Sequence, residues 1–204
     1  MFATKEKHER ALGVRLGLKP ERCASGKCAM VKKPYRPGMH GKSRQRQPSE
    51  MKTQLQEKQR LRLTFGLRES AMRAAITEAI RKRGNTADIL MSLLERRLDN
   101  VVYRLSFALS RSVARQLVGH GHICVNGRKV TIPSYRVKAN DVITMRAQSK
   151  DHPILMAARE AFGKADVPVW LALDAEKAAG TVISLPKDVP LPFDIGLIID
   201  YYSK

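Results

Sequence analysis

The residues best suited to bind a ligand begin at Ser110. Apolar residues recur after it at helical spacing, so Ser110 is a candidate N-cap, and the free backbone N–H groups of the first turn form a place where phosphate can dock. Arg111 and Arg115 stand four residues apart and share one helix face. Ser112 and Gln116 add hydrogen-bonding groups beside them. The pattern predicts a phosphate-binding helix start; the alternative is an exposed basic helix without a ligand.

A predicted hairpin carries a second pair of cations. Asn126-Gly127 is the strongest short hairpin signal, because both residues accept positive φ. Arg128 and Lys129 follow the turn directly. They converge with the arginines of the preceding helix only if helix and hairpin fold into one unit.

The net charge indicates what kind of ligand these cations bind. The chain of 204 residues has 38 Lys and Arg against 19 Asp and Glu, a formal net charge of +19. Soluble domains usually carry about 2–8 net charges, and an excess of this size repels itself unless a polyanion neutralises it. The charge is +22 over residues 1–150 and −3 over residues 151–204. The composition therefore predicts a nucleic-acid-binding protein.

The aromatic content narrows the choice of nucleic acid. The chain has 5 Phe, 5 Tyr and 1 Trp, too few to build stacking platforms for single-stranded bases. Contact with phosphates, 2′-hydroxyls and folded RNA shape suits this composition better. Further basic and polar residues on neighbouring predicted elements complete the candidate RNA-binding set: Arg44, Arg46, Lys58, Arg60, Arg62, Arg83, Asn85, Arg96, Arg97, Asn100, Arg104, His120, His122 and Asn126.

Metal and enzyme signals are weak. Cys23 and Cys28 form one Cys-x4-Cys pair, whereas structural zinc requires four Cys or His ligands, and no spacing rule favours adding His8 and His40. We therefore expect no cofactor. His-x-His at 120–122 has no carboxylate or cysteine nearby, so RNA contact or plain exposure is the expectation. No phosphate-binding glycine loop, His-Glu-x-x-His or Gly-x-Ser-x-Gly motif is found in the sequence.

The elements that position these residues follow from apolar spacing. Residues 1–48 contain repeated Pro and Gly and are predicted to be a basic arm that orders only on RNA. Helices are predicted from Ser49 to Gly66, over 69–83, and after Thr86. The predicted buried residues of these helices are Met51, Leu55, Met72, Ala75, Ile76, Ala79, Ile80, Leu90, Leu93, Leu94 and Leu98.

From residue 99 the pattern changes to short helices and strands. Val101, Val102 and Leu105 mark a short helix, and the helix after Ser110 is followed by the hairpin. Val130, Ile132, Val137 and residues 142–145 supply further strand material. A helix at 152–162, strands at 169–173 and 181–183, and a buried terminal element at 195–202 complete the chain. Trp170 is expected to be a core residue.

The motifs in this part resemble a known RNA-binding family. Ser-Arg-Ser-x-Ala-Arg-Gln-Leu-Val from Ser110 and Gly-His-Ile-x-Val-Asn-Gly-Arg-x-Val from Gly121 are similar to the module named after the fourth protein of the small ribosomal subunit. That module also occurs in pseudouridine synthases, tyrosyl-tRNA synthetases and a heat-shock protein. Residues 28–30, 36–41, 55–62, 82–86 and 202–204 resemble the bacterial ribosomal protein family itself.

The resemblance implies an α+β fold and a role in the ribosome. It implies a mostly helical N-terminal domain, an inserted helix–helix–hairpin module and a C-terminal segment that returns to the helical domain. We assign these to residues 49–92, 93–150 and 151–204, after an arm over 1–48. The family binds small-subunit ribosomal RNA early in assembly at a multi-helix junction, contacts the fifth small-subunit protein and supports translational accuracy. Its basic residues at the messenger RNA entrance channel match Arg44 and Arg46. Zinc-bearing members have a Cys-x2-Cys pair where residues 6–9 of this chain have no cysteine.

Two other function classes compete with a structural ribosomal protein. An RNA-modifying enzyme such as a pseudouridine synthase needs a catalytic domain, and residues 151–204 are too few for one. A DNA-binding regulator could insert a Ser-capped basic helix into a major groove, but the resemblance extends far beyond that helix. No apolar run reaches the ~20 residues of a membrane span, and the charged N-terminus does not resemble a secretion signal. We therefore expect a cytoplasmic, non-enzymatic protein of the ribosome with no membrane partner.

Overall fold

The computed structural model describes residues 5–44, 46–149, 167–174, 176–187 and 193–203. The chain divides into two compact units, residues 1–74 with 191–204 and residues 75–190. The fold class is α+β, as predicted. In the part of the chain that is described, no helix combines the length and apolar character needed to cross a membrane.

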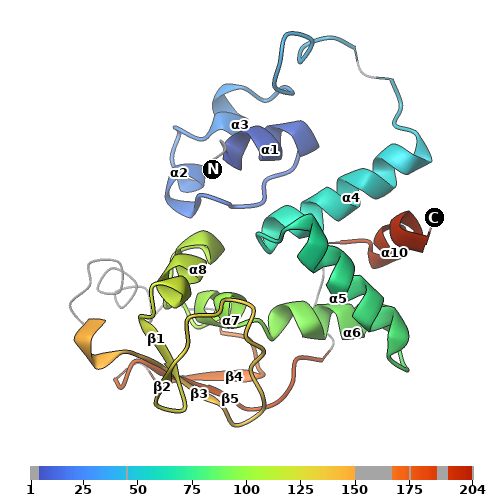
Figure 1. Ribbon diagram of the computed structural model, residues 1–204. Helices are drawn as coiled ribbons and strands as arrows, with labels where there is room; N and C mark the ends of the chain where they lie inside the picture. The colour runs from blue at the N-terminus through green and yellow to red at the C-terminus, as the bar shows by residue number, and fades with distance from the viewer. Residues whose placement is uncertain (1–4, 45, 150–166, 175, 188–192, 204) are drawn as a thin grey trace. The chain divides into compact units, whose positions relative to one another are not determined.

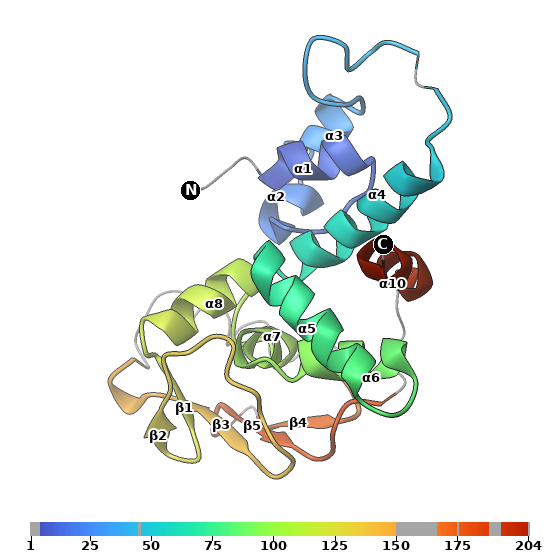
Figure 2. The ribbon, with the colours of Figure 1, turned by 45° about the vertical axis from the view of Figure 1, so that its right-hand side comes forward.

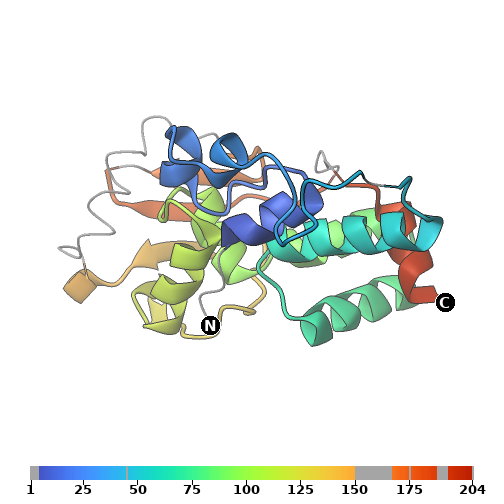
Figure 3. The same ribbon diagram turned by 90° about the horizontal axis from the view of Figure 1, so that it is seen from above.

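The first unit is helical. Its helices are α1 (Lys5–Leu12), α2 (Pro20–Ala24), α3 (Ala29–Lys32), α4 (Glu50–Thr64), the beginning of α5 (Glu69–Arg81) and α10 (Ile195–Ser203). Helix α10 packs against α4, although the two lie far apart in the chain (Figures 1 and 3). Ile195 and Ile198 are buried, as expected of the terminal element.

The region predicted as an arm contains three short helices held by polar side chains. Glu9 on α1 is fully buried, and its Oε1 accepts hydrogen bonds from the N–H groups of Leu16 at 2.9 Å and Leu18 at 3.2 Å. Arg10 Nε donates to the carbonyl oxygens of Lys33 at 2.9 Å and Tyr35 at 3.0 Å. Apolar periodicity misses this region because its local order depends on buried polar groups. The domain boundaries at 48, 92 and 150 stay predictions.

Helix α4 has the predicted ends. Ser49 is the N-cap and accepts a hydrogen bond from the Lys52 N–H at 3.4 Å. Gly66, at φ +62°, reverses the chain so that the Leu67 N–H can donate to the Arg62 carbonyl at 2.9 Å. This is the hydrogen bond of a glycine-terminated helix.

The buried face of α4 differs from the predicted one. Met51 and Leu55 are exposed, whereas Gln54, Lys58 and Leu61 are buried. Burial of a lysine is tolerated here because its Nζ is paired with a carboxylate. The inward face of α4 is therefore mixed, with two polar side chains beside Leu61.

The second unit contains the rest of α5, then α6 (Thr86–Glu95), α7 (Leu98–Arg104) and α8 (Arg111–Gly119). Helix α5 ends two residues earlier than predicted, at Arg81. Its predicted apolar face is confirmed at Met72, Ala75, Ile76 and Ala79 but wrong at Ile80, which is 52% exposed. Ile80 falls at the edge of the apolar stripe, where a helix face turns toward solvent.

The sheet of the second unit has five antiparallel strands in the order β2-β1-β3-β5-β4. The strands are β1 (Ile123–Val125), β2 (Arg128–Lys129), β3 (Val142–Met145), β4 (Leu171–Asp174) and β5 (Ala179–Val182). Helices α7 and α8 lie over one face of it (Figure 2), and the core between them includes Leu105, Phe107, Ile123, Ile143 and Trp170. The C-terminal part of the chain is thus divided, because its strands join this sheet and α10 joins α4.

Two of the predicted strand segments are not strands. Val130, Ile132 and Val137 lie in a loop that runs beside residues 96–99 instead. The loop is fastened by backbone hydrogen bonds, including Leu98 N–H to Tyr135 O at 2.8 Å and Val137 N–H to Arg96 O at 2.9 Å. The helix predicted at 152–162 lies outside the described residues. Trp170 is buried, as predicted.

Candidate nucleic-acid interface

Helix α8 begins where the sequence predicts it. Ser110 has an extended backbone, and its Oγ accepts a hydrogen bond from the Val113 N–H at 3.4 Å, so it is the N-cap. Arg111 and Ser112 form the first turn, which carries no acidic residue. The positive end of the helix dipole and the basic side chain therefore act together, and this helix end attracts anions.

A buried carboxylate holds Arg104. Glu95 is 1% exposed; its Oε1 accepts from Arg104 Nη2 at 2.8 Å and its Oε2 from Arg104 Nε at 3.0 Å. This is the two-pronged pairing that a guanidinium makes with a carboxylate. Arg104 itself keeps a side-chain exposure of 30%. One end of the pair is therefore inside the protein and the other at its surface.

A second buried carboxylate holds Arg97. Asp99 accepts from Arg97 Nε at 3.0 Å and from Arg97 Nη2 at 2.7 Å. Its Oδ2 also lies 3.9 Å from Nη1 of Arg115, whose side chain is 42% exposed. Asp99 thus links an arginine of α7's N-cap to an arginine of α8.

Asn100 connects the first carboxylate to the start of α8. Its Nδ2 donates to Glu95 Oε2 at 2.8 Å, and its Oδ1 accepts from Arg111 Nε at 2.8 Å. The Arg111 guanidinium also lies over the Tyr103 ring, 4.4 Å from its centroid. Burial lowers the pKa of Arg111, but a guanidinium stays cationic at neutral pH.

These contacts bring four predicted site residues together, and we call them the arginine cluster: Arg97, Arg104, Arg111 and Arg115. Two carboxylates face four guanidinium groups, so the cluster keeps a net positive charge. Guanidinium groups bind phosphate in the same forked geometry in which they bind carboxylate. The arrangement is therefore suited to oxyanions such as the phosphates of RNA.

The hairpin forms the predicted two-residue turn. Asn126 and Gly127 have φ of +49° and +77°, and Val125 pairs with Arg128 across the turn. Arg128 and Lys129 are exposed on β2. Gly121 makes room for the lysine chain, since a Cβ there would lie 2.1 Å from Lys129 Cε.

The Asn126 side chain stabilises this hairpin through two hydrogen bonds. Its Nδ2 donates to Asp141 Oδ1 at 2.9 Å and its Oδ1 accepts from the Val142 N–H at 2.8 Å. The side chain thus links the turn to β3, and these bonds do not favour the RNA contact predicted for Asn126.

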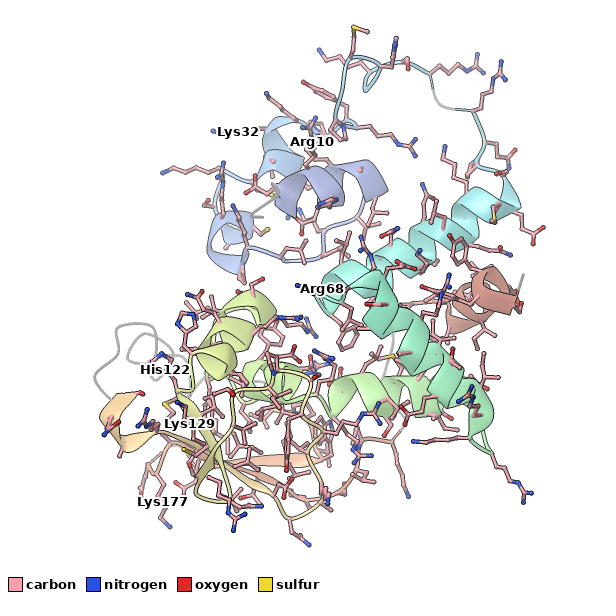
Figure 4. All side chains as sticks on the ribbon, in the orientation of Figure 1. Arg10, Lys32, Arg68, His122, Lys129 and Lys177 are labelled. Atoms are coloured by element: carbon pink, nitrogen blue, oxygen red, sulfur yellow. The ribbon has the colours of Figure 1, made fainter. Side chains whose placement is uncertain are left out.

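The two histidines lie before the hairpin. Figure 4 labels His122 near the beginning of β1 and Lys129 on β2. His122 Nδ1 is 2.9 Å from Ser149 Oγ, and its ring centroid is 6.1 Å from that of His120. In the described part of the chain, no three His, Cys, Asp or Glu side chains group as a metal site would require.

Other residues of the second unit that were predicted to contact RNA form hydrogen bonds with partners outside the arginine cluster. Asn85 is the N-cap of α6, and its Oδ1 accepts from the Ala87 N–H at 3.0 Å. Arg96 Nε donates to the Val137 carbonyl at 3.0 Å. Arg83 and the side chain of Gln116 are exposed.

In the first unit, Lys58 is not placed to touch RNA. It is 4% exposed, and its Nζ lies 2.8 Å from Glu69 Oε1 and 4.6 Å from the Tyr201 ring centroid. Arg62 Nε lies 3.9 Å from the same carboxylate. This burial does not favour the RNA contact predicted for Lys58.

The other basic residues of the first unit that were predicted to contact RNA are more exposed than Lys58. Arg60 pairs with Glu57 at 3.2 Å and lies 5.5 Å from the Phe193 ring centroid. Arg44 and Arg46 are both exposed in the segment before α4.

The two cysteines of the predicted pair lie on α2 and at the start of α3. Cys28 is buried at the N-cap of α3, and Cys23 lies on α2. Burial raises the pKa of the Cys23 thiol, which makes it a poorer metal ligand or nucleophile at neutral pH. The absence of zinc stays a prediction.

Sequence inspection missed the acidic members of this site. Glu95 and Asp99 were passed over because a search for RNA contacts looks for cations. Glu95 and Asp99 do occur four residues apart, on either side of Arg97, a spacing that places both near one helix boundary. Arg10 was also missed; Figure 4 labels it on α1, and its hydrogen bonds fasten the segment from Lys33 to Arg36.

Comparison with known families agrees with this geometry. Residues 96–143 match the S4 domain, which contains the arginine cluster and the hairpin, and residues 3–95 match the ribosomal protein S4/S9 N-terminal domain. Fold and site thus define a ribosomal protein that carries an RNA-binding S4 domain.

Individual relatives cover nearly the whole chain. The small ribosomal subunit protein uS4 of Thermus thermophilus is 48% identical over 194 residues, which cover 94% of this chain and 93% of the relative. The uS4 protein of Desulfitobacterium hafniense is 45% identical and uS4A of Symbiobacterium thermophilum 46% identical, with the same coverage. The chain belongs to the family of small ribosomal subunit protein uS4. It is a ribosomal component and not an RNA-modifying enzyme.

Proposed function

We propose that this chain is a structural constituent of the small ribosomal subunit that binds ribosomal RNA through the arginine cluster. The observation that carries the proposal is the half-neutralised cluster itself, in which two buried carboxylates pair with three of the arginines and the Asn100 amide holds the fourth, Arg111. The capped N-terminus of α8 and the exposed Arg128 and Lys129 extend the same S4 domain with further positive groups.

The finer role rests on family resemblance. We propose that the chain binds early in assembly at a multi-helix RNA junction and contacts the fifth small-subunit protein. Arg44 and Arg46, exposed before α4, would face messenger RNA at its entrance channel and support translational accuracy. The mildly acidic C-terminal part suits protein neighbours better than RNA.

Filter binding to an in vitro transcript of small-subunit ribosomal RNA tests the primary site. Arg111→Ala with Arg115→Ala should weaken binding about tenfold or more and lower the log–log salt slope by about one per lost phosphate contact. Lys177→Ala with Lys187→Ala is the matched control, because it removes the same charge from exposed positions of the same unit. Equal effects of the two double variants would show that only net charge matters.

A second comparison separates the two basic regions. Arg44→Ala with Arg46→Ala should spare ribosomal RNA binding more than the double variant of α8 does. Equal losses would mean that the segment before α4 belongs to the primary RNA site. Sedimentation of the tagged chain from cell extract tests the assignment as a whole, since the protein should migrate with small subunits.

A further inference from the structure

The arginine cluster depends on a side chain that RNA cannot reach. Glu95 is 1% exposed and uses both carboxylate oxygens inside the protein. Two of its bonds go to Arg104 and one to the Asn100 amide. Any influence of Glu95 on RNA must therefore act through the residues that it holds.

Asn100 passes this constraint on to Arg111. Its amide is fixed in one orientation, because one end donates to Glu95 at 2.8 Å while the other accepts from Arg111 at 2.8 Å. Asn100 is itself buried, 2% exposed. A single carboxylate thus orients two arginines, one on α7 directly and one on α8 through the amide.

This arrangement favours binding more than stability. A buried ion pair contributes little net stability, because desolvation offsets the attraction. An arginine side chain that is free in solution loses rotamer entropy when it is fixed on a ligand. When the fixing has already happened in the free protein, the ligand does not bear that cost.

We propose that Glu95 is a positioning residue for RNA recognition, which holds Arg104 directly and Arg111 through Asn100 in the geometry that receives the RNA backbone. The proposal rests on the proposed function. According to this proposal, a buried negative charge raises the affinity of the protein for RNA.

The sign of the effect makes the proposal testable. If charge alone mattered, loss of a carboxylate would tighten binding to a polyanion. Positioning predicts the opposite, so Glu95→Gln should weaken binding to the small-subunit ribosomal RNA transcript about tenfold. Glu78→Gln is the matched control, because Glu78 also holds an arginine through two hydrogen bonds, in the same unit but outside the cluster. This control should bind as tightly as the unsubstituted protein or more tightly.

A coupling measurement separates positioning from a general structural role. Glu95→Gln should add much less to the loss in an Arg104→Ala background than it does alone, because one of the two arginines that it holds is already gone. Additive losses would overturn the proposal, as would a Glu95→Gln variant that binds with unchanged or higher affinity.

Folding is checked by circular dichroism and urea titration. Should Glu95→Gln fail to fold, Arg104→Lys decides, since it keeps the charge but cannot make the forked pair. Weakened binding by Arg104→Lys supports the proposal, and full affinity overturns it. If the unsubstituted chain shows no preference for ribosomal RNA over an unrelated transcript of equal length, the proposed function fails instead.

Discussion

The ion pair between Glu78 and Arg136 gives a pH-dependent contribution to stability that can be isolated by one substitution. Arg136 Nη1 donates to Glu78 Oε1 at 2.8 Å, a second bond joins Nη2 to Oε2, and Lys82 Nζ lies 2.9 Å from Oε1. Hydrogen bonds from Arg136 and then Lys82 lower the pKa of Glu78 to about 2. Arg136 belongs to the loop that pairs with residues 96–99, so the ion pair joins α5 to that loop.

The size of this contribution to stability follows from the pKa of Glu78 and from the solvent exposure of the ion pair. A carboxyl group that titrates near its ordinary value of about 4.3 when unfolded and near 2 when folded corresponds to about 3 kcal/mol without screening. Glu78 and Arg136 have side-chain exposures of 31% and 45%, and exposed pairs contribute far less. We therefore expect Glu78→Gln to lower the free energy of unfolding by about 1 kcal/mol at pH 7.

The sign of the pH dependence is fixed. Because the folded pKa of Glu78 is depressed, the contribution is complete above the unfolded value and is lost as pH falls toward about 2. Urea titrations at pH 7, 5, 4 and 3 would measure it, with the fluorescence of Trp170, which is buried in the same unit and is the single tryptophan of the chain. The difference between the two proteins should shrink between pH 5 and pH 3. A difference that is equally large at pH 3, or missing at pH 7, would refute the reasoning.

Two further substitutions and one metal assay have defined outcomes. Gly180→Ala should destabilise the protein by about 1–3 kcal/mol in urea titrations, because the new Cβ would lie 2.3 Å from Cδ1 of the fully buried Leu105. Tyr202→Phe should cost about 1 kcal/mol through loss of the 2.6 Å hydrogen bond to Glu69. Burial and then the hydrogen bond to Glu69 raise the pKa of Tyr202 well above its ordinary value, so this difference should stay constant up to about pH 10 and fall only above it. Atomic absorption on the purified protein should find less than one equivalent of zinc, and a full equivalent would contradict the metal-free prediction.

Helix ends and the hairpin turn were predicted correctly from short sequence motifs. The N-caps at Ser49 and Ser110, the Gly66 terminus and the Asn126-Gly127 turn all depend on a few neighbouring residues, and the structure confirms each. The sequence of two helices followed by a hairpin could therefore be predicted. Helices α1, α2 and α3 could not be predicted, because buried Glu9 and hydrogen-bonded Arg10 replace the apolar spacing that such predictions use.

Long-range pairing escaped the sequence pattern. Strand β5 pairs with β3 although Thr181 and Val142 lie far apart in the chain. Nothing in the alternation of residues 179–182 specifies which strand they join. Likewise, the burial of Lys58 depends on Glu69 and on the tyrosines of α10, which the helix sequence alone does not contain.

The acidic residues explain how the charge excess becomes a site. Residues 66–150 contain six of them, and five accept hydrogen bonds from groups of the protein: Glu69, Glu78, Glu95, Asp99 and Asp141. Counted as surface charges they would only weaken attraction for RNA. Bonded as they are, Glu95 and Asp99 convert mobile arginines into fixed ones while leaving the cluster positive. The effect of a carboxylate on RNA binding therefore depends on which side chains it bonds. The same loss of one negative charge is expected to weaken RNA binding at Glu95 and not at Glu78.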